Sequence, residues 1–196
     1  RLDSILNSDN KKYFEYPQYI SLDSYIDRIL HTQNGKKAQI VNFNINYVTE
    51  RLGKSLVKIY SKLIFNYVTS LKERGSEPFN IIIEEAHRYV QNDIDSDVLG
   101  YNIFERITKE GRKYGVILGM ISQRPSEISE TAMSQCNNFI IFKMTHPTDI
   151  AYIKKVVPFM SEENTEKMKS ILPGNALCFG TAFKMPLLVK FEYPDP

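Results

Sequence analysis

The chain has 196 residues, of which 42% are hydrophobic and 24% charged, and its formal net charge is +2. These values are ordinary for a folded globular domain and exclude disordered, collagen-like and coiled-coil chains. Because the net charge is so small, any binding of nucleic acid must depend on a local basic patch. No apolar run approaches the length of a membrane span, the first residues do not form a signal peptide, and two cysteines are too few for a disulfide framework. We therefore expect a reducing, cytoplasmic setting and no membrane partner.

The first part of the chain has the weakest periodicity. Residues 1–37 are expected to form a helical and irregular segment with one helix around residues 21–30, and residues 38–196 to belong to one α/β domain. "AQIVNFNI" (38–45) predicts a strand. The pattern over residues 50–75 predicts a long helix that Gly75 ends. Its apolar face is expected to comprise Leu52, Leu56, Ile59, Leu63, Tyr67 and Leu71.

The rest of the chain alternates between strands and helices. Residues 79–83, 116–121 and 139–144 are apolar throughout, which is typical of strands in a parallel sheet covered on both faces. Helices are expected over residues 98–113, 127–136, 149–157 and 161–172. Residues 176–193 are too short for a crossover helix and predict an antiparallel strand pair. The sequence thus predicts an α/β fold: a mostly parallel sheet flanked by helices, with a C-terminal antiparallel pair.

Polar residues follow the predicted parallel strands. Glu84 and Glu85 come directly after strand 79–83, and Gln123 follows strand 116–121. Ligands of open parallel sheets bind beyond the carboxyl ends of the strands. Carboxylates there suit Mg²⁺ binding and activation of an attacking water, and a glutamine can hydrogen-bond that water or a terminal phosphate. In the alternative interpretation the two glutamates mark where the strand reaches solvent, and the glutamine bonds its own loop.

Histidines and cysteines give no competing site. His31, His87 and His146 share no metal-ligand spacing with one another or with a cysteine. We expect His87 to pack or hydrogen-bond within the fold. Cys136 precedes an apolar strand, where a buried, inert thiol is the ordinary outcome.

Four stretches, "IIIEEAHRYV", "EGRKYGV", "SQRPSEI" and "SQCNNFIIFKMTHPTDI", occur in this order. Together they resemble the HerA family of hexameric DNA-translocating ATPases, relatives of FtsK in the additional-strand RecA-like group. The resemblance covers about residues 38–190 and implies a RecA-like sheet, ATP and Mg²⁺ as cofactors, and double-stranded DNA bound through its phosphates. It also implies a homo-hexamer and a nuclease or other effector as partner, in DNA repair or antiphage defence.

The same resemblance assigns roles to single residues. Glu84 is expected on the metal side, holding Mg²⁺ through water, although the family usually has Asp there. Glu85 would be the base that polarises water, and Gln123 the sensor of the γ-phosphate. Arg112 is the candidate arginine finger reaching into a neighbouring subunit, since its planar fork stays charged. Alternatively, Arg112 is only a favourable cation at a helix C-terminus.

The phosphate-binding motif G-x-x-x-x-G-K-[ST] is absent from the 196 residues. "NGKK" (34–37) lacks the loop, and "GKS" (53–55) falls inside a predicted helix, whose amides are engaged in helix bonds. We therefore expect this chain to be the C-terminal half of a longer protein and inactive by itself. Two hypotheses remain: part of a DNA-pumping motor, or a non-catalytic ATPase-fold scaffold for partner docking. Candidate DNA-contacting cations are Lys36, Lys37 and Lys143.

Overall fold

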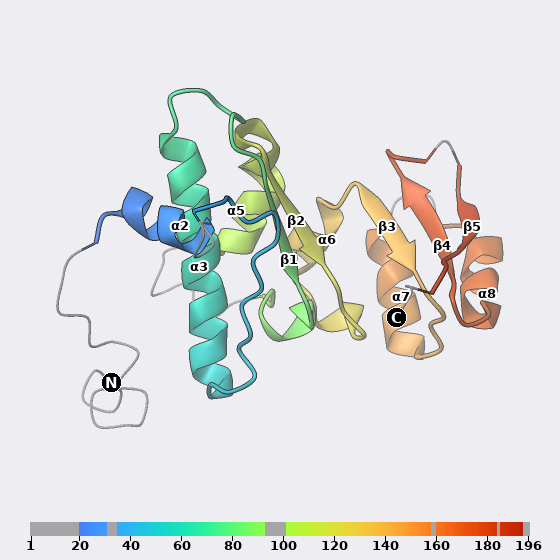
Figure 1. Cartoon of the computed structure of the whole chain (residues 1–196). Coiled ribbons are helices and arrows are strands. Elements are labelled where there is room, and N and C mark those ends of the chain that lie inside the picture. Colours follow the sequence, from blue (N-terminus) through green and yellow to red (C-terminus); the bar gives the residue numbers. More distant parts are fainter. Residues whose placement is uncertain (1–19, 31–34, 93–100, 158–159, 184, 194–196) are drawn as a thin grey trace. The chain divides into compact units, whose positions relative to one another are not determined.

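The computed structural model describes residues 20–30, 35–92, 101–157, 160–183 and 185–193 (Figure 1). The chain divides into two compact units, residues 1–45 and residues 46–196. The predicted boundary between residues 37 and 38 stays a prediction. None of the helices in the described ranges is long and apolar enough to cross a membrane.

The first unit contains the predicted helix α2 (Leu22–Leu30). Its Ile26 is buried, at 2% exposure. The strand predicted over residues 38–45 is wrong, because these residues form no strand and Ile40 is 88% exposed. An apolar run becomes a strand only where a partner strand takes up its backbone hydrogen bonds, and no such pairing is formed here among the described residues.

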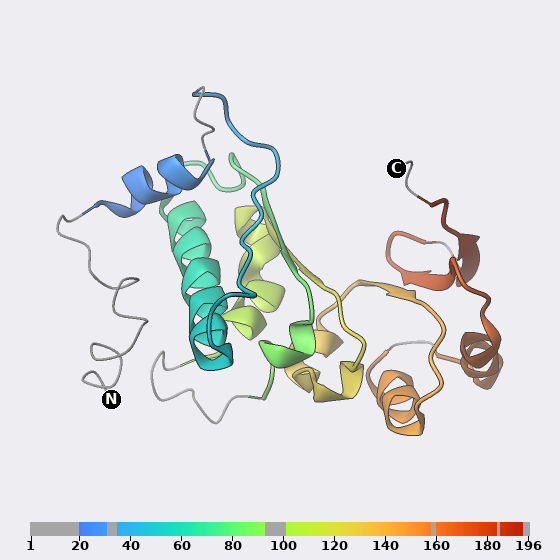
Figure 2. The same cartoon turned by 60° about the horizontal axis from the view of Figure 1, so that its bottom comes forward.

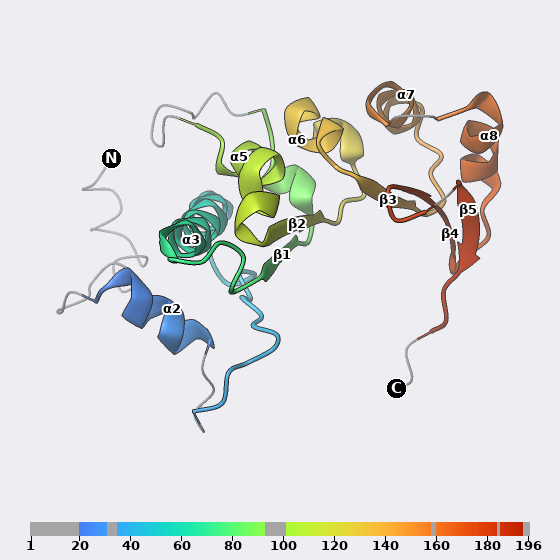
Figure 3. The ribbon, with the colours of Figure 1, turned by 90° about the horizontal axis from the view of Figure 1, so that it is seen from above.

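The second unit is built on a parallel strand pair. β1 (Phe79–Ile83) pairs with β2 (Val116–Met120), with Phe79 opposite Val116 and Ile83 opposite Met120. Both strands confirm the sequence predictions. Helices α3 (Glu50–Ser70) and α5 (Ile103–Glu110) lie on one side of the pair (Figure 3). On the other face the side chains of Ile82 and Ile117 are 66% and 62% exposed, so in the described part of the chain helices cover only one face.

Helix α3 buries a different side from the one predicted. The residues that are fully buried are Gly53, Ser61, Phe65 and Val68. With 3.6 residues per turn, Ser61, Phe65 and Val68 lie roughly opposite the predicted face, on which Ile59 is 43% exposed. Phe65 stacks edge-on against Tyr114, with ring centroids 5.8 Å apart. The helix thus has apolar residues on two sides, and the side that faces α5 and η3 is the one that is buried.

Short helical turns connect these elements. Three 3₁₀ turns lie in the described part of the chain: η2 (Ala86–Arg88) after β1, η3 (Gly111–Tyr114) between α5 and β2, and η4 (Pro125–Glu127) after β2. Helix α6 (Glu130–Ser134) follows η4. Figure 2 shows the yellow and orange chain turning through η4 and α6 before the next strand. Helix α5 is shorter than the predicted 98–113, of which residues 98–100 lie outside the described ranges.

The C-terminal part is an antiparallel sheet. Its strand order is β3 (Asn138–Ile141), β4 (Asn175–Gly180), β5 (Leu187–Lys190), and both pairings are antiparallel. Helices α7 (Pro147–Val156) and α8 (Glu162–Ser170) lie on one side of it (Figure 3). The α/β fold class and the predicted antiparallel pair are confirmed. The assignment of the strand near residue 139 to the parallel sheet is wrong, since β3 pairs with β4 instead.

Candidate active site

The chain turns sharply where β1 ends, at Glu85. This residue has φ 50° and ψ 44°, and among the described residues it is the one non-glycine residue with a positive φ. A left-handed conformation costs an L-residue about 1–2 kcal/mol, so surrounding contacts must hold it. Two backbone bonds do so: the Ala86 amide donates to the Ile121 carbonyl (2.9 Å), and the Ile121 amide donates to the Ile83 carbonyl (3.0 Å). The turn therefore lies directly beside the end of β2.

Glu85 and Gln123 meet at this edge. Gln123 Nε2 donates to Glu85 Oε1 at 3.2 Å, joining the residues that follow the two neighbouring strands. The second carboxylate oxygen, Oε2, lies 3.3 Å from His87 Nδ1. The Glu85 side chain remains 43% exposed, so solvent or a ligand can reach the carboxylate. The arrangement is a carboxylate contacted at both oxygens and open on one side, as a base acting on water requires.

Glu84 is separate from this network. It follows the buried Ile83, and its side chain is exposed. No group of three or more His, Cys, Asp or Glu residues in the described ranges could enclose a metal ion. One or two carboxylates suffice for Mg²⁺ when phosphates and water supply the other oxygens, so the exposed Glu84 carboxylate has the chemistry to hold such an ion.

Arg112 lies at the other end of the strands. It belongs to η3, which precedes β2, and its side chain is exposed. Gly115, with φ 77°, ends this turn, and the Phe79 amide donates to its carbonyl at 2.9 Å. From Gly115 to Ile121 a strand rising about 3.3 Å per residue spans about 20 Å. The structure therefore does not bring Arg112 to the Glu85 site of its own chain.

The loop that carries Gln123 is anchored to α7. The amide and hydroxyl of Ser126 both donate to Asp149 Oδ1, at 3.1 and 2.6 Å, and Asp149 is buried, at 7% exposure. The Tyr152 hydroxyl donates to the Ile128 carbonyl at 2.8 Å. Burial, with smaller contributions from nearby anionic groups, raises the pKa of Tyr152 to about 12. The segment after β2 is thus fixed to a helix that also packs on the antiparallel sheet.

A buried serine links three further elements. Ser129 is fully buried, and its hydroxyl donates to Glu105 Oε1 of α5 at 2.7 Å. Its oxygen also accepts the Ala132 amide at 3.3 Å, which caps α6, and its own amide donates to the Val90 carbonyl at 2.7 Å. The segment after Glu85, the loop after β2 and α5 consequently form one connected unit.

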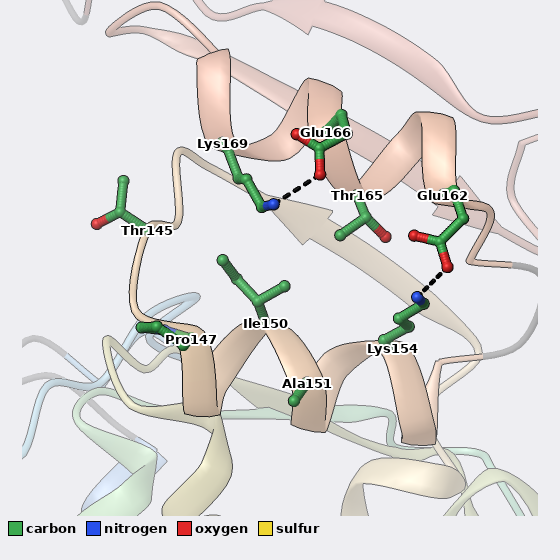
Figure 4. A pocket seen from close by; sticks show the side chains of 9 residues that line it. All are labelled: Thr145, Pro147, Ile150, Ala151, Lys154, Glu162, Thr165, Glu166 and Lys169. Atoms are coloured by element: carbon green, nitrogen blue, oxygen red, sulfur yellow. Dashed lines mark hydrogen bonds and ion pairs between the residues drawn. The ribbon is translucent and has the colours of Figure 1, made fainter.

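A hollow of about 490 Å³ lies between α7 and α8 (Figure 4). It is lined by Thr145, Pro147, Ile150, Ala151, Lys154, Glu162, Thr165, Glu166 and Lys169. Lys154 pairs with Glu162, and Lys169 Nζ lies 2.6 Å from Glu166 Oε1. The cations in this hollow already have anionic partners, and none of the predicted site residues lines it.

The expected hydrogen bond of His87 within the fold is confirmed by its contact with Ser122. Its contact with Glu85 was not expected, and Ser122, Ser126, Ser129 and Asp149 received no role. One pattern could have suggested Ser122 and His87, because both lie within two residues of a predicted site residue at the same sheet edge. Nothing in the sequence pairs Asp149 with Ser126, which lies 23 positions away. His31 lies outside the described residues.

Comparison with known proteins gives no matching family model. The chain is 30% identical to the DNA double-strand break repair helicase HerA of Saccharolobus solfataricus, over 97% of this chain and 38% of that protein. It is 29% identical to the Sulfurisphaera tokodaii protein of the same name, over 98% of this chain and 41% of that one. A probable helicase of Methanocaldococcus jannaschii is 36% identical over 72% of this chain and 27% of its own length. The chain thus spans between about a quarter and two fifths of these relatives.

Solved structures show the same fold. The genome packaging NTPase B204 of Sulfolobus turreted icosahedral virus 2, in complex with sulfate, has a TM-score of 0.59 at 18% identity, over 96% of this chain and 78% of that one. The same NTPase in complex with AMPPCP gives a TM-score of 0.58 at 16% identity, over 90% of this chain and 73% of that one. At these identities the likeness establishes the fold alone.

Proposed function

Because the chain is a homologue of the HerA helicases over almost its whole length, we propose that it is the part of an ATP-driven double-stranded DNA translocase that activates water for hydrolysis. The observation that carries this proposal is the Glu85 carboxylate, held by Gln123 at the carboxyl edge of a parallel sheet. A packing role alone would not require a strained backbone at a half-exposed glutamate.

In this proposal Glu85 accepts a proton from the water that attacks the terminal phosphate of ATP. Gln123 bonds Glu85 Oε1 and senses whether the phosphate is present, because its amide can exchange that bond for one to a phosphate oxygen. Its loop is fixed to α7 through Ser126 and Asp149, so a change at Gln123 reaches α7. Bound Mg²⁺, on the Glu84 side, would neutralise phosphate charge.

Arg112 is proposed to act on a neighbouring subunit. Its place at the amino end of β2 keeps it away from its own Glu85, which suits a residue that acts in trans. A homo-hexamer closed around DNA would bring each Arg112 to the next subunit's nucleotide, and DNA phosphates would be gripped without base recognition. Lys36, Lys37 and Lys143 stay candidate DNA contacts, and a nuclease or other effector stays the proposed companion.

The test of this function is Glu85→Gln in the natural full-length polypeptide. The amide keeps the size and shape of the side chain and one acceptor oxygen, but it cannot take up a proton. We expect ATP turnover to fall by about 100-fold or more, the scale of losing a positioned base, with nucleotide affinity unchanged within about threefold. Glu73→Gln, an exposed glutamate before β1, is the matched control and should turn over normally.

Mixing subunits separates the trans role from a structural one. Arg112→Ala subunits mixed with Glu85→Gln subunits should recover part of the hydrolysis, because some interfaces then join an intact Glu85 to an intact Arg112. Normal turnover by Glu85→Gln would show that Glu85 is not the base. Absence of ATP hydrolysis in the wild-type full-length polypeptide would favour the alternative, a non-catalytic scaffold. If the mixed rings assemble but stay inactive, the proposed trans role of Arg112 would be wrong, whereas the role of Glu85 would be unaffected.

A further inference from the structure

His87 lies against the carboxylate that the proposed function uses as a base. Its Nδ1 atom is 3.3 Å from Glu85 Oε2 and 3.0 Å from the Ser122 hydroxyl oxygen. The His87 side chain is 13% exposed, and Ala86 before it is fully buried. The ring is therefore held in place by the fold and does not sample solvent freely.

The hydrogen bonds around Nδ1 determine which ring nitrogen carries the proton. An ionised carboxylate only accepts, so a bare Nδ1 would turn its lone pair toward Glu85 Oε2 and be repelled. The Ser122 oxygen already accepts the Arg124 amide at 3.0 Å and can accept a second bond. A proton on Nδ1 satisfies both neighbours at once, because it is shared between Glu85 Oε2 and Ser122 Oγ.

We propose that His87 is a positioning residue for Glu85, donating its Nδ1 proton to Oε2 while Gln123 donates to Oε1. This inference rests on the proposed function, since it assigns His87 a task only if Glu85 is the base. Two donors from different segments fix both the position and the rotation of the carboxylate. The left-handed turn at Glu85 is what allows residues 85 and 87 to face the end of β2 together.

The arrangement has a consequence for hydrolysis. A carboxylate held at both oxygens needs no reorganisation when the attacking water arrives, so losing one donor lowers turnover more than nucleotide binding. One hydrogen bond to a charged group corresponds to about a tenfold to hundredfold change in rate. Gln123 can exchange its bond for one to phosphate, whereas His87 would keep Glu85 aligned throughout.

Two isosteric replacements test the proposal in the full-length polypeptide. In His87→Asn the amide nitrogen takes the place of Nδ1, whereas in His87→Gln the amide lies near the position of Nε2. We expect His87→Gln to lower kcat about tenfold or more, with nucleotide affinity within about twofold, and His87→Asn to stay within about threefold of wild type. In a Glu85→Gln background, His87→Gln should add no further loss, because the two residues act as one unit.

A purely structural His87 predicts a different outcome. Both replacements would then lower kcat in proportion to their loss of thermal stability, and asparagine would bring no recovery. This result, or normal turnover by His87→Gln, overturns the proposal while leaving Glu85 as the base. If Glu85→Gln itself hydrolyses ATP normally, the proposed function fails first, and the positioning role fails with it.

A measurement independent of activity uses the 196-residue chain. Nitrogen chemical shifts of the His87 ring in two-bond ¹H–¹⁵N spectra report which nitrogen is protonated. We expect the proton on Nδ1 in the wild type, whether the ring is neutral or charged. A neutral ring protonated only on Nε2 would leave a lone pair facing Glu85, and the proposal would be wrong.

Discussion

Replacing Ser129 by alanine perturbs the junction between the segment after Glu85, the loop after β2 and α5. Alanine keeps the backbone bond from residue 129 to the Val90 carbonyl. It removes the hydroxyl that donates to Glu105 Oε1 at 2.7 Å and that accepts the Ala132 amide at the start of α6. Because Ser129 is fully buried, water cannot replace these two bonds easily.

The magnitude follows from the two lost bonds. Removing a serine N-cap costs about 1 kcal/mol, and removing a hydrogen bond to a charged group costs about 1.5–3 kcal/mol. Glu105 is 24% exposed, and its Oε2 lies 3.9 Å from Lys109 Nζ, so part of its solvation is retained. We therefore expect the free energy of unfolding to fall by about 2–3 kcal/mol.

Urea unfolding of the 196-residue chain, followed by far-ultraviolet circular dichroism, measures this change. Ser134→Ala is the matched control, because Ser134 is exposed in α6 and its hydroxyl donates to the Thr131 carbonyl of the same helix at 3.0 Å. Surface changes of this kind stay within about 0.5 kcal/mol. A double-mutant cycle with Glu105→Ala should give a coupling of about 1 kcal/mol or more.

A free energy of unfolding for Ser129→Ala within about 0.5 kcal/mol of the wild-type value would show that these two bonds do not stabilise the fold. If the losses from Ser129→Ala and Glu105→Ala simply add, the hydroxyl and the carboxylate stabilise the fold independently, and the predicted coupling is wrong. In either case the junction would be held by packing rather than by hydrogen bonds.

Two further predictions concern a thiol and a glycine. Burial raises the pKa of Cys136 to about 11. At pH 8 iodoacetamide should therefore label Cys136 about two orders of magnitude more slowly in the native chain than in urea, and the native rate should rise as the pH approaches 11. Comparable labelling rates in the two states, measured by peptide mass spectrometry, would contradict this prediction. Gly180 has φ 130°, and a Cβ there would lie 2.1 Å from the Asn137 carbonyl oxygen. Because of this overlap, Gly180→Ala should lower the free energy of unfolding by about 2–4 kcal/mol. Gly75→Ala, at φ 74° with open space around it, is the control and should cost about 1 kcal/mol; equal losses would show that crowding at Gly180 is relieved.

Several strands could be predicted from the sequence, because local patterns of apolar residues indicate them. The apolar runs at 79–83 and 116–121 predict β1 and β2, and residues that follow parallel strands meet at one edge of the sheet. This reasoning placed Glu85 and Gln123 near each other, and the structure joins them by a hydrogen bond. Their roles in hydrolysis stay predictions.

Other features were decided only by tertiary structure, because they depend on partners distant in the sequence. The run at 38–45 has the composition of a strand, but it pairs with no strand among the described residues. The strand near residue 139 pairs with β4 and not with the parallel strands. Helix α3 has apolar residues on two sides, and contacts with α5 and η3 bury one of them.

The same limit applies at the candidate site. The sequence by itself determined which chemical groups gather at the end of the parallel strands. Glutamate does not favour the left-handed backbone conformation that Glu85 adopts, so no local sequence pattern predicts this turn. That turn, held by backbone bonds to the end of β2, is what aims His87 at Glu85. The presence of these groups is local information, whereas their orientation is set by contacts between segments more than thirty residues apart.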